Sequence, residues 1–277
     1  MNREIFFQAG MGIVVGAVLL ALFAPFVAGY APDEFSGPPL AKPSADHLLG
    51  TNDLGQDILS RLIYGTRATL IIGFLGALVA VAIGTMIGIV AGYYGGKIDE
   101  MISRIVDVMM TIPTFPLLLV LTVLLSPGIY VISLLMGVIG GAHSCRVIRS
   151  QVLSLAETNH ILGAKALGLS NPYIMARHIL PNVLPLIIVK YVFSAQGFML
   201  MGVGLGFLGI GDAAVIDWGQ MINRAYSSGA FALGMWWWIG PPGLAVTVLS
   251  IGLAMIGFGL EDRLNPRLRH KNVEAIA

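Results

Sequence analysis

The stretch Ala68–Tyr94, ATLIIGFLGALVAVAIGTMIGIVAGYY, contains no charged side chain. A helix needs about 20 mainly apolar residues to cross the hydrocarbon core of a bilayer, and this stretch is longer than that. It also lacks the alternation of apolar and polar residues that is typical of strands in membrane barrels. Because only helices and closed barrels satisfy their backbone polar groups in lipid, the stretch predicts a transmembrane helix.

The composition of the whole chain extends this prediction. Hydrophobic residues make up 56% of the 277 residues and charged residues 11%, and the mean hydropathy is +0.84. These values exclude an ordinary soluble domain. Segments long enough to span a membrane lie at about 8–30, 68–94, 103–125, 129–147, 183–210 and 236–260. The expected fold is therefore an all-α polytopic membrane protein with six transmembrane helices.

Lysine and arginine residues are unequally distributed over the connections between these segments. The set of connections that includes both termini and residues 146–182 contains eleven of them, and the other set contains four. By the positive-inside rule, both termini and the 146–182 loop are expected in the cytoplasm. The net charge of +1 gives no reason to expect nucleic acid as a partner.

A polar stretch, residues 151–186, interrupts the apolar chain with QVLSLAETNHILGAKALGLSNPYIMARHILPNVLPL. It predicts two short helices joined at a sharp corner outside the membrane. Gly168 can end the first helix in a left-handed conformation. Ser170 or Asn171 can cap the second helix, and Pro172 suits its first turn, where no N–H is needed. Pro181 and Pro185 are expected to end the second helix.

This helix–corner–helix resembles the coupling loop of bacterial ATP-binding-cassette (ABC) importer permeases, whose pattern is E-A-A-x3-G-x9-I-x-L-P. Leu162 replaces the Glu of that pattern and His178 replaces the Ile. The positions that match are Gly163, Ala164, Gly168, Leu180 and Pro181.

A second and more specific resemblance precedes the second span. Residues 47–67, HLLGTNDLGQDILSRLIYGTR, are similar to the signature found there in dipeptide, oligopeptide and nickel permeases, with Gln56 in place of the usual Arg. The stretch is amphipathic, which is also typical of an ordinary surface helix. The resemblance continues to about His270 and so covers most of the chain.

The resemblance implies a transport subunit of an ABC importer in the inner membrane of a bacterium or archaeon. A second homologous permease, cytoplasmic ABC ATPases and an external substrate-binding protein are the implied partners, with ATP and Mg held by the ATPases. This chain is expected to bind no cofactor or metal and to catalyse no reaction. Its Gly95-Gly96-Lys97 is no phosphate loop, because Ile98 stands where Ser or Thr is required. Di- or oligopeptide is the favoured solute, and nickel or a metal chelate is possible.

The resemblance also assigns candidate sites. The positions expected to couple this chain to the ATPase are Gly163, Ala164, Lys165, Gly168, Leu169, Ser170, Pro172, Arg177 and Pro181. The positions expected to contact the external binding protein are Asn52, Asp53, Trp218 and Gln220.

Three units follow from the same reasoning. Residues 1–67 form an N-terminal transmembrane helix and an external segment, and residues 266–277 form a cytoplasmic tail. Residues 68–265 form the permease domain, with the cytoplasmic coupling loop at 151–182.

Three smaller patterns concern ion pairs, a nucleotide-binding fingerprint and helix packing. Glu100, Arg104 and Asp107 are spaced to form ion pairs along one helix. Gly204-x-Gly206-x-x-Gly209 matches a dinucleotide fingerprint, but no strand precedes it, so the match is taken as accidental. Glycines with the four-residue spacing of a helix-packing face are Gly84, Gly88, Gly92 and Gly96.

Two other interpretations remain open at this stage. An ion- or proton-coupled secondary transporter is also all-helical, although internal repeats and broken helices with polar groups at the membrane midplane would be expected of it. The 157–181 stretch can also be a polar connector with no coupling function.

Overall fold

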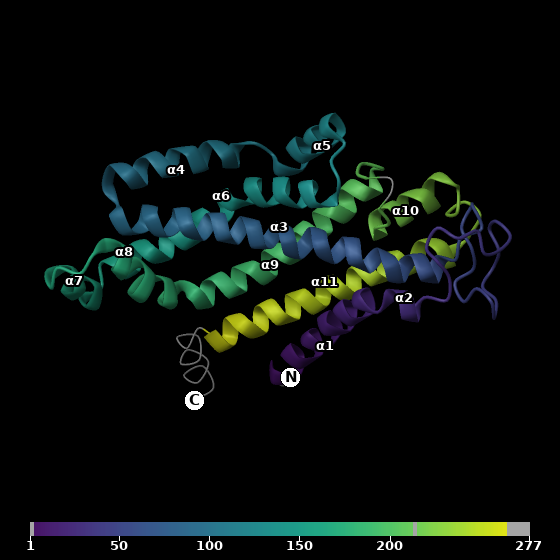
Figure 1. Cartoon of the computed structure of the whole chain (residues 1–277), viewed down its shortest axis with the longest axis horizontal. Coiled ribbons are helices and arrows are strands. Elements are labelled where there is room, and N and C mark those ends of the chain that lie inside the picture. Colours follow the sequence, from purple (N-terminus) through teal and green to yellow (C-terminus); the bar gives the residue numbers. More distant parts are fainter. Residues whose placement is uncertain (1–2, 213–214, 265–277) are drawn as a thin grey trace.

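The computed structural model describes residues 3–212 and 215–264, and this part of the chain is a bundle of helices (Figure 1). The helices are α1 (Arg3–Leu22), α2 (Ala24–Val27), α3 (Ile58–Tyr94), α4 (Gly96–Thr111), α5 (Thr114–Leu125), α6 (Ile129–Ala156), α7 (Asn159–Ala166), α8 (Asn171–Ile174), α9 (Leu180–Phe207), α10 (Trp218–Ser227) and α11 (Trp236–Leu264). Five helical stretches in this part of the chain are long and apolar enough to cross a membrane, and there are six if the bent pair of α4 and α5 counts as one span. The all-α polytopic fold is confirmed. The tail predicted at 266–277 lies outside the described residues.

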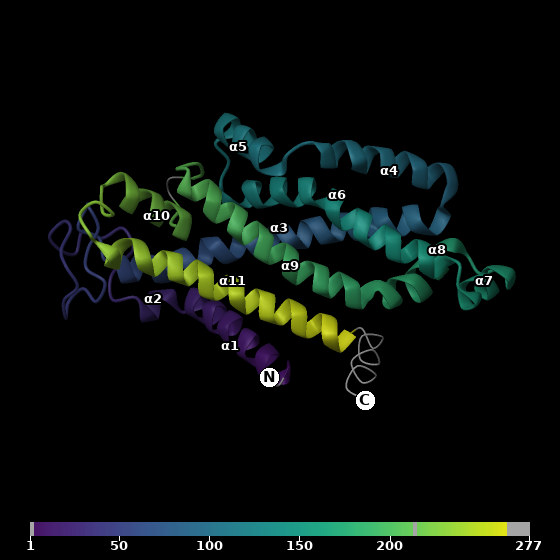
Figure 2. The same ribbon diagram turned by 180° about the vertical axis from the view of Figure 1, so that it is seen from behind.

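The long helices run along one axis and give the molecule two ends (Figures 1 and 2). One end, here called the α10 end, contains α10 and the irregular segment 28–57. The opposite end, called the α7 end, contains α7, α8 and the turn between α3 and α4. Helix α1 runs toward the α10 end and α11 runs away from it, so both described ends of the chain point to the α7 side.

The expected third span, 103–125, is broken. Helices α4 and α5 are separated at Ile112 and Pro113 and bent by 75°. The ring of a proline disfavours helical angles at the residue before it, and Ile112 accordingly has the extended values φ −83° and ψ 122°. Mean apolarity over 103–125 did not reveal the break, because the apolar α5 dominates the average although α4 is amphipathic.

Two predicted boundaries fall within helices. Helix α3 begins at Ile58, so the boundary expected between residues 67 and 68 lies inside it. Asp57 caps this helix by accepting a hydrogen bond from the Ser60 N–H at 2.7 Å. The predicted loop 151–182 likewise begins inside α6, which continues to Ala156.

Helices α3 and α6 pack closely through glycine. A Cβ placed on Gly84, Gly88 or Gly92 would clash with side-chain or backbone atoms of α6. The predicted packing face is therefore confirmed for these three positions. Gly96 differs, because nothing lies within 4 Å of a Cβ there and its φ of +52° serves the turn into α4.

Ion pairs hold α4 against α6. Glu100 pairs with Arg104 along α4, as predicted. The expected pairing of Arg104 with Asp107 is wrong, because Asp107 pairs with Arg146 of α6. Asp99, about two turns earlier than Asp107, pairs with Arg149 of α6. Spacing along one helix could not predict partners that lie on another.

Candidate functional site

The corner predicted in the polar stretch is present at the α7 end (Figure 1). Helix α7 ends at Ala166, and Gly168 has a φ of +75°, the left-handed conformation expected of it. The Leu169 N–H then reaches back to the Ala164 carbonyl at 3.2 Å, and the Gly168 N–H bonds the Lys165 carbonyl at 3.0 Å. These bonds turn the chain sharply and close the end of the helix.

The second helix begins as the sequence predicted. Ser170 precedes it in an extended conformation, and Pro172 occupies its first turn. The side chain of Asn171 makes a different contact from the one expected of a cap, because its Oδ1 accepts a hydrogen bond from the hydroxyl of Tyr93 at 2.8 Å. Tyr93 lies at the end of α3, so this bond ties the corner to a transmembrane helix.

The prediction that Pro181 and Pro185 end this helix is wrong. Helix α8 continues through a π-helical turn, Met175–Ile179, into α9, and Pro185 lies inside α9. In the π turn the Leu180 N–H bonds the Met175 carbonyl, five residues back. This wider turn changes the hydrogen-bond register directly before Pro181, so the missing proline N–H does not stop the helix.

The underside of the corner is apolar and buried. Ile161, Ala164, Ile174 and Ile179 belong to one apolar cluster with residues of α3 and α6. The α3 and α6 members of this cluster are Ile89, Tyr93, Ile148 and Val152. Lys165 adds a contact from above, with its Nζ 4.6 Å from the centre of the Tyr93 ring. The corner is therefore seated on the ends of two transmembrane helices.

The predicted coupling positions divide between the two faces of the corner. Ala164 is buried in the cluster and cannot contact another protein directly. The exposed ones are Gly163, Lys165, Gly168, Leu169, Ser170, Pro172, Arg177 and Pro181. Sequence reasoning missed the apolar side chains Leu162, Leu167 and Tyr173, which are also exposed, Leu167 to 82%. They alternate with Ile161, Ala164 and Ile174 around their helices, and that periodicity could have identified them.

At the α10 end, Asn52 organises the segment before α3. Its side chain is 1% exposed, and its Oδ1 accepts hydrogen bonds from the N–H groups of Leu54 and Gln56, both at 2.9 Å. Its Nδ2 donates to Gln56 Oε1 at 2.7 Å. This compact turn presents the neighbouring Asp53, whose Oδ1 accepts a hydrogen bond from Arg224 Nε of α10 at 2.7 Å.

Trp218 and Gln220 belong to the first turn of α10. Trp218 is 3% exposed and donates from Nε1 to the Leu62 carbonyl of α3 at 3.0 Å, so it anchors α10 rather than facing a partner. The N–H of Gln220 bonds Asp217 Oδ1 at 3.0 Å, which makes Asp217 the cap of the helix. Gly206 of the glycine fingerprint has a structural role here, because a Cβ on it would clash with Asp217.

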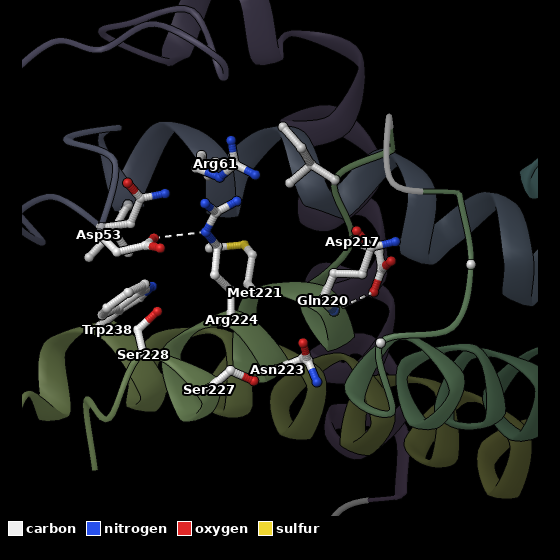
Figure 3. Close-up of a pocket in the computed structure, with 15 residues that line it drawn as sticks. Asp53, Arg61, Asp217, Gln220, Met221, Asn223, Arg224, Ser227, Ser228 and Trp238 are labelled. Carbon is white, nitrogen blue, oxygen red and sulfur yellow. Dashed lines mark hydrogen bonds and ion pairs between the residues drawn. The ribbon is translucent and has the colours of Figure 1, made fainter. Parts of the chain in front are cut away.

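The α10 end contains a cavity of about 410 Å³ (Figure 3). Asn52, Asp53 and Gln220 line it, whereas Trp218 does not. Charged residues that the sequence analysis had not selected also line it: Arg61 of α3, Arg224 of α10 and Asp217. Burial raises the pKa of the Asp217 carboxyl to about 6, against the opposing effect of the backbone N–H groups of Gln220 and Gly219.

Comparison with known proteins matches residues 84–270 to the family described as binding-protein-dependent transport system inner membrane component. The dipeptide transport system permease protein of Alkalihalophilus pseudofirmus is 37% identical over 263 residues, which is 94% of this chain and 85% of that protein. The dipeptide and oligopeptide transport system permease proteins of Bacillus subtilis are each 32% identical, cover 95% of this chain, and are themselves covered to 82% and 86%.

Proposed function

The chain belongs to the family of binding-protein-dependent transport system inner membrane components, and from that membership we propose that it carries short peptides across the membrane in an ATP-driven importer. Similar proteins are permeases of dipeptide and oligopeptide transport systems, which supports peptides over nickel or a metal chelate as the solute. ATP hydrolysis, with its Mg, belongs to partner ATPase subunits in this proposal.

The proposed assembly contains this chain, a second homologous permease, ABC ATPases at the α7 end and a substrate-binding protein at the α10 end. The α7 end and both termini lie in the cytoplasm, in keeping with the excess of Lys and Arg in those connections. Of the four positions predicted for contact with the binding protein, Asp53 and Gln220 retain exposed surface. Asn52 and Trp218 support them from within the fold.

The observation that carries the proposal is the seating of the corner. Its apolar underside is buried on α3 and α6, while its outer side exposes Leu162, Leu167 and Tyr173 to a partner. An exposed apolar surface of this kind is typical of a protein interface. Movement of a bound ATPase would therefore be transmitted through packed side chains to two spans. Reversing a 1:99 equilibrium between two states takes about 5.5 kcal/mol, which ATP-driven closure of the partner subunits can supply.

Gly168→Val tests coupling through the corner. The left-handed φ of +75° at Gly168 is strained for a β-branched side chain, so the corner should deform while the spans still insert. Gly229→Val is a matched control, because Gly229 also has a φ of +75° and follows a short helix, and at both glycines nothing lies within 4 Å of an added Cβ. Both variants would be reconstituted with the partner permease, the ATPases and the binding protein in liposomes.

We expect Gly168→Val to lose at least tenfold in peptide uptake and in stimulation of ATP hydrolysis by the binding protein, and Gly229→Val to retain both. Equal losses in the two variants would mean that backbone strain, and not the corner, is responsible. Uptake by the wild-type chain without any ATPase, driven by an ion or proton gradient, would replace the importer with a secondary transporter.

A further inference from the structure

The cavity at the α10 end brings together two guanidinium groups from distant parts of the chain. Arg61 extends from the first turn of α3 and Arg224 from the last turn of α10, and both line the cavity (Figure 3). The side chain of Arg61 is 13% exposed and that of Arg224 is 38% exposed. They lie close enough for their positive charges to repel each other. Such a pair costs free energy unless negative charge lies nearby, and Asp33 and Asp53 supply some of it.

The acidic groups near the two arginines are unevenly placed. Asp33 contacts Arg61 at 3.4 Å, but its side chain is 80% exposed and lies in solvent. Asp53 contacts Arg224 through Nε. A guanidinium carries five N–H donors in a planar fork that matches the two oxygens of a carboxylate. Arg61 uses Nη1 to donate to the Pro32 carbonyl at 2.7 Å, and Arg224 uses Nε to donate to Asp53. Each fork therefore has one nitrogen engaged within the protein and keeps further N–H groups.

The remaining walls are suited to the rest of a small polar molecule. Trp238 and Met221 provide apolar surface, and Gln220 and Asn223 present amide groups (Figure 3). The amides are held in position, since Gln220 Nε2 donates to the Asp212 carbonyl at 3.1 Å and Asn223 Nδ2 donates to the Phe207 carbonyl at 2.7 Å. A volume of about 410 Å³ lies within the usual range of small-molecule sites.

We propose that this cavity binds the free carboxylate of a short peptide between Arg61 and Arg224, as a receiving site within this chain. The inference rests on the proposed function, which makes peptides the solute. The peptide carboxylate occupies the N–H groups of Arg61 and Arg224 that Pro32 and Asp53 leave available. Asp53 then competes with the ligand for Arg224. Removing the charge of Asp53 should therefore strengthen ligand binding, whereas changing Arg224 should weaken it.

The test measures binding of L-alanyl-L-alanine and of its C-terminal amide to the full-length chain, assembled with its partner permease and ATPases in lipid nanodiscs without ATP or binding protein. Saturation-transfer NMR supplies the affinities. We expect the amide to bind at least tenfold more weakly than the acid. Arg224→Lys keeps the charge and the pairing with Asp53 but loses the fork, and should weaken binding of the acid about tenfold. Asp53→Asn should strengthen it.

Arg67→Lys is the control, because Arg67 lies on α3 outside the cavity, donating from Nε to the Ala21 carbonyl. It should leave both affinities unchanged. Equal binding of acid and amide, or no effect of Asp53→Asn and Arg224→Lys, would overturn the proposal. Weaker docking of the binding protein to Arg224→Lys, with no binding of the dipeptide to any form, would assign the arginines to an acidic side chain of that protein instead.

ATP-driven uptake by the complete system separates this proposal from the proposed function. If ATP-driven uptake is intact but the acid and the amide bind equally well, the cavity site is wrong and the importer proposal stands. If the acid binds more tightly than the amide but no ATP-driven uptake is observed, the cavity site stands and the importer proposal is wrong.

Discussion

Gly168 and Gly229 have the same backbone conformation at opposite ends of the molecule, and their surroundings differ. Each has a φ of +75° after a short helix, and the following N–H returns to a carbonyl five residues back, at 3.2 Å for Leu169 and 3.0 Å for Ala230. Around Gly168 the chain buries one apolar face and exposes another. Gly229 lies near a cavity that it does not line, and polar side chains of α10 and of segment 28–57 surround that cavity.

The polar groups of the α10 end are bonded mainly to one another. The buried side chain of His47 contacts Asp57, the cap of α3, at 3.0 Å. Asp53 of the same segment, 28–57, bonds Arg224 of α10. The corner at the α7 end is instead held by apolar packing, with one side-chain hydrogen bond from Tyr93 to Asn171 and the contact of Lys165 with the Tyr93 ring.

This difference indicates different tasks for one type of turn. Apolar packing transmits displacement because its contacts are dense and resist compression. A polar network fixes the positions and directions of individual donors, as a binding site requires. We therefore expect changes at the α7 end to affect coupling between subunits, and changes at the α10 end to affect recognition and pH dependence.

The largest effect is expected from Ile161→Asp. Ile161 is fully buried beneath the corner, and an unpaired charge there should cost about 3–5 kcal/mol. The corner should leave its seat on α3 and α6, and limited proteolysis should cut within residues 157–170. Leu167→Asp, also in the corner but exposed, should resist proteolysis like the wild type and still lose co-purifying ATPase. Unchanged proteolysis of Ile161→Asp would show that apolar seating does not hold the corner.

A smaller effect is expected from protonation at the α10 end. The pKa of Asp217 is raised to about 6 by burial, above its usual 3.8, so the folded protein holds this proton more tightly than the unfolded chain. This contribution to stability is fully present below pH 3.8 and is lost as the pH rises through 6. Its size is about 3 kcal/mol, since the pKa rises by about two units and one unit corresponds to about 1.4 kcal/mol.

Thermal unfolding of the purified chain between pH 4.5 and 7.5 measures this contribution. Asp217→Asn keeps an oxygen to accept from the Gln220 N–H and should remove the decline in melting temperature across that range. Asp46→Asn, at an exposed carboxylate of the same end, controls for the change in net charge. A decline that persists in Asp217→Asn would assign the pH dependence to another group.

The sequence predicted those features that depend on short stretches of chain. Apolar length located the spans, and the local rules for Gly168 and Pro172 located the corner. Pro113 also acts locally, but its effect was outweighed by the mean apolarity of 103–125, so one span was expected where α4 and α5 are separate.

Features that depend on distant contacts could not be predicted in the same way. Asp107 pairs with Arg146, 39 residues away, and the two arginines of the cavity are separated by most of the chain. The passage of the helix through Pro181 required the π turn before it, which propensity rules do not include. Burial of Asn52 and Trp218 likewise follows from tertiary packing.

The smallest effect is expected from Tyr93→Phe, which separates the two ways in which the corner is held. The change removes the hydroxyl that donates to Asn171 Oδ1 at 2.8 Å and keeps the ring beneath Lys165 and within the apolar cluster. Asn171 is exposed, so water replaces the lost donor, and the cost should be about 1 kcal/mol or less.

If apolar seating dominates, ATP-driven uptake by Tyr93→Phe should fall by no more than about fivefold, which corresponds to that free energy. Tyr191→Phe, which removes a longer hydrogen bond of 3.4 Å to the Phe74 carbonyl inside the bundle, is the matched control and should leave uptake unchanged. A loss in Tyr93→Phe as large as that in Gly168→Val would mean that one hydrogen bond transmits the movement. The α7 end would then work by the same directional contacts as the α10 end, and the contrast between them would disappear.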